Sequence, residues 1–334
     1  MISKALGHGW QPVEIVPKGL NLFARARRTA VAWPEPGARL SWDELAGKVA
    51  GSAQVLCIVN LKRHALHLTN LLADSSAVFH LSTNMCPAHR DRVLDEVRRR
   101  LRDRKPCRLI STQCVEAGVD VDFPSVIRAW GPLESIAQAA GRCNRNGRQV
   151  EGRVQVFVPD DPGQLYPDGA YERAAKVAEA LFRELGREAL DINDEELYRR
   201  YYMMLYGLAA PETLCKEILE AGRLQHFPDV SRLYRLIDTD AINVLVPYDL
   251  DAYHALAAEV RDTGLTASWI TKARAHAISV FRPQRDDPLR DWLESVRIRA
   301  GRTIADDWFI YLNEAHYSDV SGLCPPESMD CLIA

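Results

Sequence analysis

The chain has 334 residues, of which 47% are hydrophobic and 26% are charged, and its formal net charge is −3. This length and apolar content suffice for two domains. No apolar run approaches the roughly 18 residues of a membrane span, and Met1 opens into a stretch without the charged flank and apolar core of a signal peptide. These features exclude a membrane or exported protein and predict a cytoplasmic one.

The charge is distributed unevenly along the chain. Residues 1–160 hold 23 Lys and Arg against 15 Asp and Glu, whereas the remainder holds 19 against 30. A basic first part suits contact with a phosphate backbone. The run RRRLRDRK at 98–105 can equally be a solvated helix face. Eight cysteines form no Cys-x-x-Cys pair, which indicates reduced thiols.

The segment 1–40, with the turn-rich WPEPG at 33–37, is predicted to lead into the fold as an irregular stretch. From 41 to 160, short apolar strands alternate with helices. The predicted strands are 54–60, 77–82, 107–112, 125–130 and 153–159, and the predicted helices are 61–73, 87–103 and 133–142. This alternation predicts an α/β domain with a parallel sheet, helices on both faces and functional loops at the carboxyl ends of the strands.

After Pro159 the pattern becomes helical. Helices are predicted over 169–188, 193–208 and 211–224, which gives a helical linker spanning 161–226. The last part, 227–334, mixes short helices with strands at 242–248 and 307–313, and is predicted to be a small α+β accessory domain.

An arginine row follows the third predicted helix. The segment QAAGRCNRNGR at 138–148 places Arg142, Arg145 and Arg148 three residues apart, with small or turn-forming residues between them. Guanidinium groups can spread the charge of a phosphoryl group during its transfer. The alternative is a solvated helix end with no ligand.

A second polar segment, STQCVEAGVDVDF at 111–123, follows the strand 107–112. Thr112 ends this strand, where a hydroxyl and the next backbone amides can meet a nucleic-acid phosphate; it can also cap the following turn. Gly118 allows a turn that presents the carboxylate of Asp120, which suits a ribose hydroxyl or a catalytic water.

These two segments resemble motifs V and VI of superfamily-two helicases, and their sequences are similar to those of the type I CRISPR-associated helicase-nuclease family. QVLCIVNLKRHALHL at 54–68 also resembles the start of that family's second RecA-like domain, and YSDVSGL at 317–323 resembles its carboxyl-terminal stretch. The resemblance implies that 41–160 is a second RecA-like helicase domain carrying motifs IV to VI.

The resemblance also implies a role for each matching residue. Arg142 and Arg145 would be the catalytic arginines that reach the γ-phosphate of ATP. The implied nucleotide-binding residues are Gly118, Asp120 and Gln138, and the implied contacts to single-stranded DNA are Ser111 and Thr112. Ala139 stands where many family members have an arginine, so one coupling contact of the family is in doubt.

Other motifs of the family do not occur in these residues. There is no GxxxxGK[ST] loop, no DExH or DExD box, and no histidine followed by aspartate for a metal nuclease. His64 and His67 lie one helical turn apart without a second ligand pair, so no metal site is predicted. The expectation is that ATP is shared with a first RecA-like domain that also holds Mg²⁺, and that this chain does not hydrolyse ATP alone.

Three functions remain open from the sequence. The first is the carboxyl-terminal part of the CRISPR helicase-nuclease, from a truncated or split gene, which unwinds DNA once joined in cis or trans to its front half. The second is a non-catalytic module that docks on single-stranded DNA or on the CRISPR surveillance complex. The third is part of a different superfamily-two helicase. None of them involves a membrane.

Overall fold

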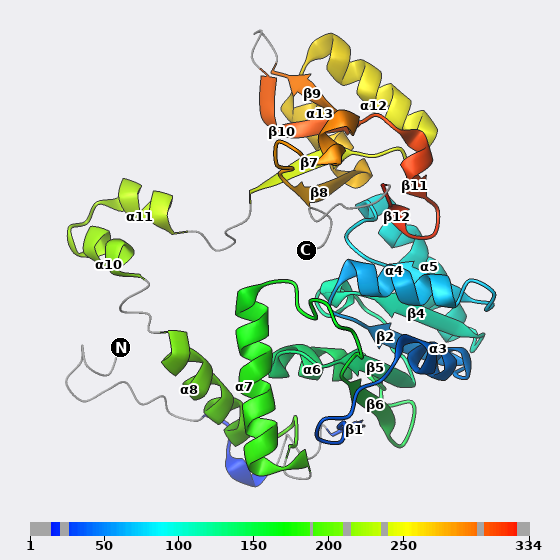
Figure 1. The fold of residues 1–334 in the computed structure, drawn as a ribbon, viewed down its shortest axis with the longest axis vertical. Helices are drawn as coiled ribbons and strands as arrows, with labels where there is room; N and C mark the ends of the chain where they lie inside the picture. The colour runs from blue at the N-terminus through cyan, green and yellow to red at the C-terminus, as the bar shows by residue number, and fades with distance from the viewer. Residues whose placement is uncertain are drawn as a thin grey trace.

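Figure 1 shows the computed structural model, which describes residues 15–20, 27–187, 190–209, 215–234, 240–298 and 304–325. An α/β unit is followed by an arm of helices and then by a smaller unit built on a mixed sheet. None of the helices within these ranges is long and apolar enough to cross a membrane.

The first unit is built on a six-stranded sheet in which every neighbouring pair of strands is parallel. The strand order is β1-β6-β5-β2-β4-β3. The bounds are β1 Thr29–Ala32, β2 Gln54–Ile58, β3 Val78–Leu81, β4 Cys107–Ser111, β5 Ser125–Ala129 and β6 Gly152–Phe157. The predicted parallel sheet is therefore confirmed.

Helices cover both faces of this sheet. One face packs against α3 (Trp42–Ala50) and α4 (Lys62–Leu71), and the other packs against α5 (Pro87–Arg102) and α6 (Leu133–Ala140). Successive side chains of a strand point to opposite faces, so the strands need apolar residues at almost every position. In β2, Leu56 and Ile58 belong to the core under α5 and α6, while Val55 and Cys57 belong to the core under α3 and α4.

Two elements of this unit were not predicted. The segment 1–40 was expected to be irregular, but Thr29–Ala32 forms β1 and pairs with β6, so the sheet begins before residue 41. Four residues between arginines and a proline-rich turn give no recognisable strand pattern. Helix α3 begins at a capping box, in which the Ser41 hydroxyl accepts from the Glu44 amide and the Glu44 carboxylate accepts from the Ser41 amide. That Ser-x-x-Glu signal was present in the sequence.

The linker is helical, as predicted. Helix α7 (Gly169–Leu185) begins at the N-cap Asp168 and lies against α6, and α8 (Glu195–Ala209) packs beside it. The predicted helix 211–224 corresponds to the shorter α10 (Lys216–Arg223); its positions 211–214 lie outside the described residues. A further helix, α11 (Phe227–Leu233), follows.

The second unit has a four-stranded sheet in the order β8-β7-β10-β9. Only the β7–β10 pair is parallel, and the other two pairs are antiparallel. The bounds are β7 Ala241–Leu245, β8 Ala277–Phe281, β9 Leu293–Arg297 and β10 Ile304–Tyr311, with helices α12 Leu250–Thr263 and α13 Ala267–Ala273. The helices cover one face through a core that includes the buried Trp269. This unit is the predicted α+β domain.

A two-stranded hairpin, β11 (Tyr317–Ser318) with β12 (Gly322–Leu323), joins the second unit to the first (Figure 1). The Tyr317 hydroxyl accepts from the backbone amide of Cys86 at 3.2 Å and lies 3.0 Å from Nδ1 of His89. The His89 ring stacks on Tyr248 at 4.5 Å between centroids. The YSDVSGL stretch therefore holds the second unit against the start of α5.

Gly322→Ala is expected to weaken this attachment. Gly322 has φ +80°, and a Cβ there would lie 2.3 Å from the carbonyl oxygen of Asn84. Backbone strain and this overlap together should cost well over 1 kcal/mol, because alanine is unfavourable at positive φ. The measurement is the midpoint of urea unfolding. Gly37→Ala is the matched control, since Gly37 has φ +78° with no atom within 4 Å of the added Cβ; equal losses in the two variants would contradict a contact at Gly322.

A buried histidine predicts loss of stability in mild acid. His80 in β3 is 2% exposed and lies between the hydroxyls of Thr69 and Ser82, at 3.1 and 2.9 Å. Burial lowers its pKa to about 4. The unfolded chain binds this proton near pH 6.5, so the stabilisation is complete above that pH and is lost as the pH falls through about 4, by about 3 kcal/mol in all.

Unfolding in urea at pH 7 and at pH 4.5 measures this effect. His80→Gln should make stability less dependent on pH between these values, whereas the exposed His67→Gln is the control. The same pH dependence in His80→Gln as in the unchanged chain would rule out His80 as the source.

Candidate nucleotide and DNA site

The two polar segments singled out in the sequence lie side by side. Phe123 and Cys143 form a parallel bridge, in which the Phe123 amide donates to the Arg142 carbonyl and the Asn144 amide donates to the Phe123 carbonyl, both at 2.9 Å. The first segment runs from the carboxyl end of β4 to the amino end of β5, and the second leads from the end of α6 to the start of β6. The structure therefore brings together the two segments that resemble motifs V and VI.

Arg142 is anchored to the backbone of motif V. Its Nε donates to the carbonyl of Val115 at 3.1 Å, and its Nη2 donates to the carbonyl of Glu116 at 2.5 Å. The side chain is half-buried, and burial, followed by the charge of Arg145, lowers the pKa of its guanidinium. The two backbone acceptors fix the orientation of this cation.

Arg145 is the more exposed of the two arginines. Its side chain is 43% exposed, and its Nε lies 3.4 Å from Oδ1 of Asp120. An ion pair between exposed groups contributes little to stability, so Arg145 can exchange Asp120 for another anion. Gly118, at φ +73°, forms the turn that leads to Asp120.

The turn that carries Arg145 is held by residues that sequence reasoning missed. Asp122 accepts from the Arg145 amide at 2.7 Å and from the Asn146 side chain at 2.9 Å. The Asn144 side chain exchanges two hydrogen bonds with the backbone of Gln149, each 3.0 Å long. Arg148 pairs with Asp122 at 3.8 Å and is 63% exposed. The signal in the sequence was Asp122, the second aspartate of VDVDF.

Ser111 and Thr112 lie at the carboxyl end of β4, directly before the turn whose Val115 carbonyl accepts from Arg142. Both are buried, at 0% and 5% exposure. The Ser111 hydroxyl donates to the carbonyl of Leu81 at 3.0 Å. Thr112 stands at the N-cap of the 3-10 turn η2 (Gln113–Val115) without a side-chain capping bond. Gln138, in turn, is exposed on α6.

A buried charged cluster, which no sequence pattern predicts, lies behind the segment 111–123. Arg128 in β5 is fully buried; its Nη2 lies 2.9 Å from Oε1 of Glu116 and donates to the hydroxyl of Tyr171 at 2.6 Å. Its Nη1 donates to Oδ1 of Asn60 at 2.7 Å. A Cβ at Gly131 would lie 2.8 Å from the Tyr171 hydroxyl. An arginine inside the apolar strand SVIRAW was the available signal.

Burial governs the ionisation of this cluster. Desolvation raises the pKa of the Glu116 carboxyl, and the charge of Arg128 opposes that rise. Burial works against the charge of Arg128, but Tyr171 and Glu116 outweigh it and hold the pKa of the guanidinium above its usual range. The arginine therefore stays charged, and its partners surround it.

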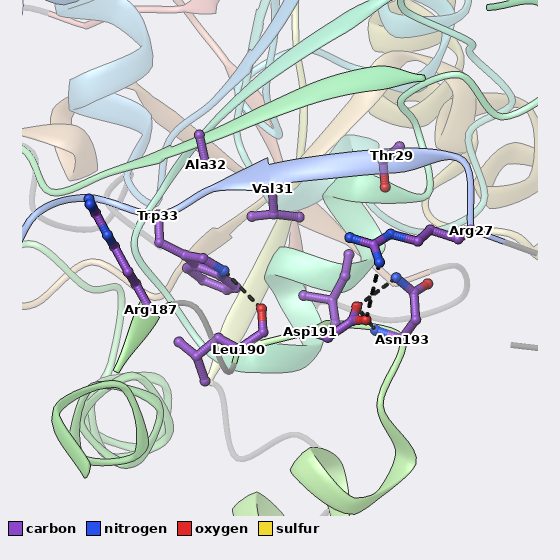
Figure 2. A pocket seen from close by; sticks show the side chains of 10 residues that line it. Arg27, Thr29, Val31, Ala32, Trp33, Arg187, Leu190, Asp191 and Asn193 are labelled. Carbon is purple, nitrogen blue, oxygen red and sulfur yellow. Dashed lines mark hydrogen bonds and ion pairs between the residues drawn. The ribbon is translucent and has the colours of Figure 1, made fainter. Parts of the chain in front are cut away.

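The cavity in Figure 2 does not belong to this site. It has a volume of about 430 Å³ and lies between β1 and the chain around Asp191. Its arginines already have partners, because Arg27 pairs with Asp191 and Arg187 pairs with Glu35. Within the described residues, no group of three or more His, Cys, Asp or Glu side chains is arranged to hold a metal ion.

Comparison of the sequence with protein families gives a match over the helicase motifs. The family model of the CRISPR-associated nuclease/helicase Cas3, C-terminal, matches residues 51–148. Cas3 of Haloferax volcanii is 51% identical over 65 residues, which cover 19% of this chain and 7% of that protein. Cas3 of Methanothermobacter thermautotrophicus is 33% identical over 92 residues, which cover 28% of this chain and 11% of that protein. The matched segments are thus a small part of these relatives.

Solved structures extend the likeness to nearly the whole chain. T. fusca Cas3 has a TM-score of 0.56 at 14% identity, covering 94% of this chain and 42% of that one. A chain of a CRISPR RNA-guided surveillance complex, pre-nicking, has a TM-score of 0.53 at 15% identity, covering 92% and 44%. At these identities the likeness shows a shared fold. Residues 51–148 are therefore similar to the C-terminal family of the CRISPR-associated nuclease/helicase Cas3, and the chain has the fold of part of T. fusca Cas3.

Proposed function

We propose that this chain forms one wall of the ATP site of a Cas3-type DNA helicase, with Arg142 and Arg145 as its catalytic residues. The observation that carries the proposal is that one arginine is fixed by backbone carbonyls, while the arginine beside it has an exposed ion pair that a phosphate can replace. The bonds of Arg142 to backbone carbonyls engage its Nε and Nη2. Arg145 stands beside it on the surface, next to a carboxylate that it can exchange.

Bound ATP supplies the γ-phosphoryl group that is transferred to water. Arg142 binds and orients that group from a fixed position, and Arg145 leaves Asp120 to stabilise the charge that develops during transfer. The released Asp120 carboxylate can then accept a hydrogen bond from the ribose or from a water. Gly118 and Gln138 complete the nucleotide side of this wall. We assign Mg²⁺ and the phosphate-gripping loop to the first RecA-like domain.

We assign the DNA contact to the loop at the carboxyl end of β4. Because Ser111 and Thr112 are buried, their proposed role is to shape this loop so that its backbone meets the phosphates of single-stranded DNA. These assignments give DNA to the end of the segment 111–123 that follows β4, and nucleotide to the end that carries Asp120.

The proposed partners follow from these assignments. They are single-stranded DNA, a first RecA-like domain in cis or in trans, and a CRISPR surveillance complex, because one similar structure is a chain of such a complex. The proposed location is the cytoplasm, where the seven described cysteines, all free, stay reduced.

The experiment is reconstitution of ATP hydrolysis. The chain is mixed with a first RecA-like domain of a Cas3 protein that carries the Walker A and acidic motifs, and phosphate release is measured with and without single-stranded DNA. DNA-stimulated hydrolysis only in the mixture supports the proposal. Hydrolysis by this chain alone would refute the division of the site between two domains.

A second candidate function is a docking module without catalysis. Exposed apolar side chains on α8 favour it: Met203, Tyr206 and Leu208 are 68%, 65% and 68% exposed. Binding of DNA or of a surveillance complex, with no hydrolysis in the mixture described above, would support this alternative.

A further inference from the structure

The Arg128 cluster connects three parts of the chain that are distant in sequence. Glu116 belongs to motif V, Arg128 to β5, and Tyr171 to the first turn of the linker helix α7. The contacts are continuous, because Glu116 accepts a bond from Arg142 through its carbonyl and pairs with Arg128 through its carboxylate. Arg128 in turn donates to Tyr171. One chain of polar contacts thus runs from the arginine pair to the linker.

We propose that Glu116, Arg128 and Tyr171 are positioning residues for Arg142, and that they couple α7 to the catalytic arginines. This inference rests on the proposed function. The backbone of Glu116 is one of the two acceptors that orient Arg142. A displacement of the Glu116 side chain moves that acceptor, and Arg128 and Tyr171 hold the side chain from behind.

The chemistry of the cluster favours positioning over simple stabilisation. Apolar side chains of similar volume usually stabilise a core as well as, or better than, a buried ion pair does. A guanidinium, in contrast, has a planar fork that accepts partners only in fixed directions. Here the fork donates to Asn60 and Tyr171, and its Nη2 also lies 2.9 Å from the Glu116 carboxylate. The arrangement fixes directions between elements, as an active-site support requires.

The Tyr171 hydroxyl is the part of the cluster that belongs to the linker. It receives a hydrogen bond from Arg128 and donates to Oδ1 of Asn60 at 3.1 Å. The absence of a side chain at Gly131 leaves room for this hydroxyl. A movement of α7 therefore pulls on Arg128 first, and through Glu116 on the carbonyl that orients Arg142.

Steady-state kinetics of the reconstituted ATPase provides the first test. Glu116→Gln and Tyr171→Phe should lower kcat by about 10- to 100-fold, the penalty for small displacements of a catalytic group, with KM for ATP nearly unchanged. Tyr166→Phe is the matched control, because Tyr166 lies beside Tyr171 at 6.1 Å between rings and outside the cluster. Arg128→Lys should also lower kcat although it keeps the positive charge, because an ammonium lacks the planar fork. Unchanged kcat in Tyr171→Phe would overturn the coupling.

Hydrogen exchange on the chain alone provides the second test and needs no activity. Tyr171→Phe should speed exchange of the backbone amides in 112–123, while Tyr166→Phe should not. If exchange in 112–123 is the same in both variants, the inference fails. If the unchanged chain gives no ATPase in the mixture, the proposed function fails, and the exchange experiment still decides whether α7 is coupled to motif V.

Discussion

Replacing Arg145 by alanine is expected to lower ATP hydrolysis by the reconstituted helicase by about 10³- to 10⁵-fold, the contribution of an arginine finger in phosphoryl transfer. The guanidinium is 43% exposed, and the ion pair it makes within the described residues is with the exposed carboxylate of Asp120. It can therefore reach a phosphate at little cost. The loss should fall mainly on kcat, because the charge that Arg145 is proposed to stabilise develops only in the transition state.

Arg148→Ala is the matched control for this prediction. Arg148 lies in the same turn, has the same charge, and pairs with Asp122 at 3.8 Å while 63% exposed. Its loss should change kcat by less than about tenfold, since a surface charge contributes mainly a weak, screened field. Comparable losses for Arg145→Ala and Arg148→Ala would show that the segment acts through its net charge and would contradict a specific finger.

The sequence predicted what depends on local pattern. The strands around Leu56, Leu109 and Val126 are apolar on both faces, and this pattern is typical of the interior of a parallel sheet. The segments 111–123 and 138–148 stood out because glycines and charges gather there, and their assignment to motifs V and VI, which rests on a family resemblance, stays a prediction. The same reasoning missed β1, because the four residues Thr29–Ala32 acquire their strand conformation from pairing with β6.

The parts of the site that were missed depend on contacts between distant segments. Asn60, Glu116, Arg128 and Tyr171 converge from positions up to 111 residues apart. In the sequence, Asn60, Glu116 and Tyr171 give no sign of this contact. Arg128 was the exception, since a charge inside an apolar strand must find a partner or destabilise the fold. A buried arginine in the sequence indicates that a partner exists, and the structure identifies Glu116 as that partner.

Replacing Arg128 by methionine is expected to destabilise the chain by about 3–5 kcal/mol, because it leaves a buried carboxylate without its counter-charge. Arg128 is fully buried, and the Glu116 side chain is 5% exposed. Such a loss is a large fraction of the roughly 5–15 kcal/mol that stabilises a typical domain. The free energy of unfolding, measured in urea, gives the value.

Two further variants separate the ion pair from the packing. Arg128→Met combined with Glu116→Gln removes both charges, so the double variant should be more stable than Arg128→Met alone. Arg261→Met is the surface control: Arg261 pairs with Glu294 at 2.6 Å, but the two side chains are 49% and 34% exposed, and its loss should cost less than about 1 kcal/mol. Equal costs at the two sites would show that burial does not determine the value of the pair.

The pH dependence of Arg128→Met gives an independent check. Burial already raises the pKa of Glu116 while Arg128 opposes the rise, so removing the arginine should raise that pKa further. Protonation then neutralises the unpaired carboxylate in the folded state before it does so in the unfolded one. The difference in unfolding free energy between the unchanged chain and Arg128→Met should therefore shrink as the pH falls from 7 toward 5. A difference that stays constant over this range would place the loss in packing and not in the charge of Glu116.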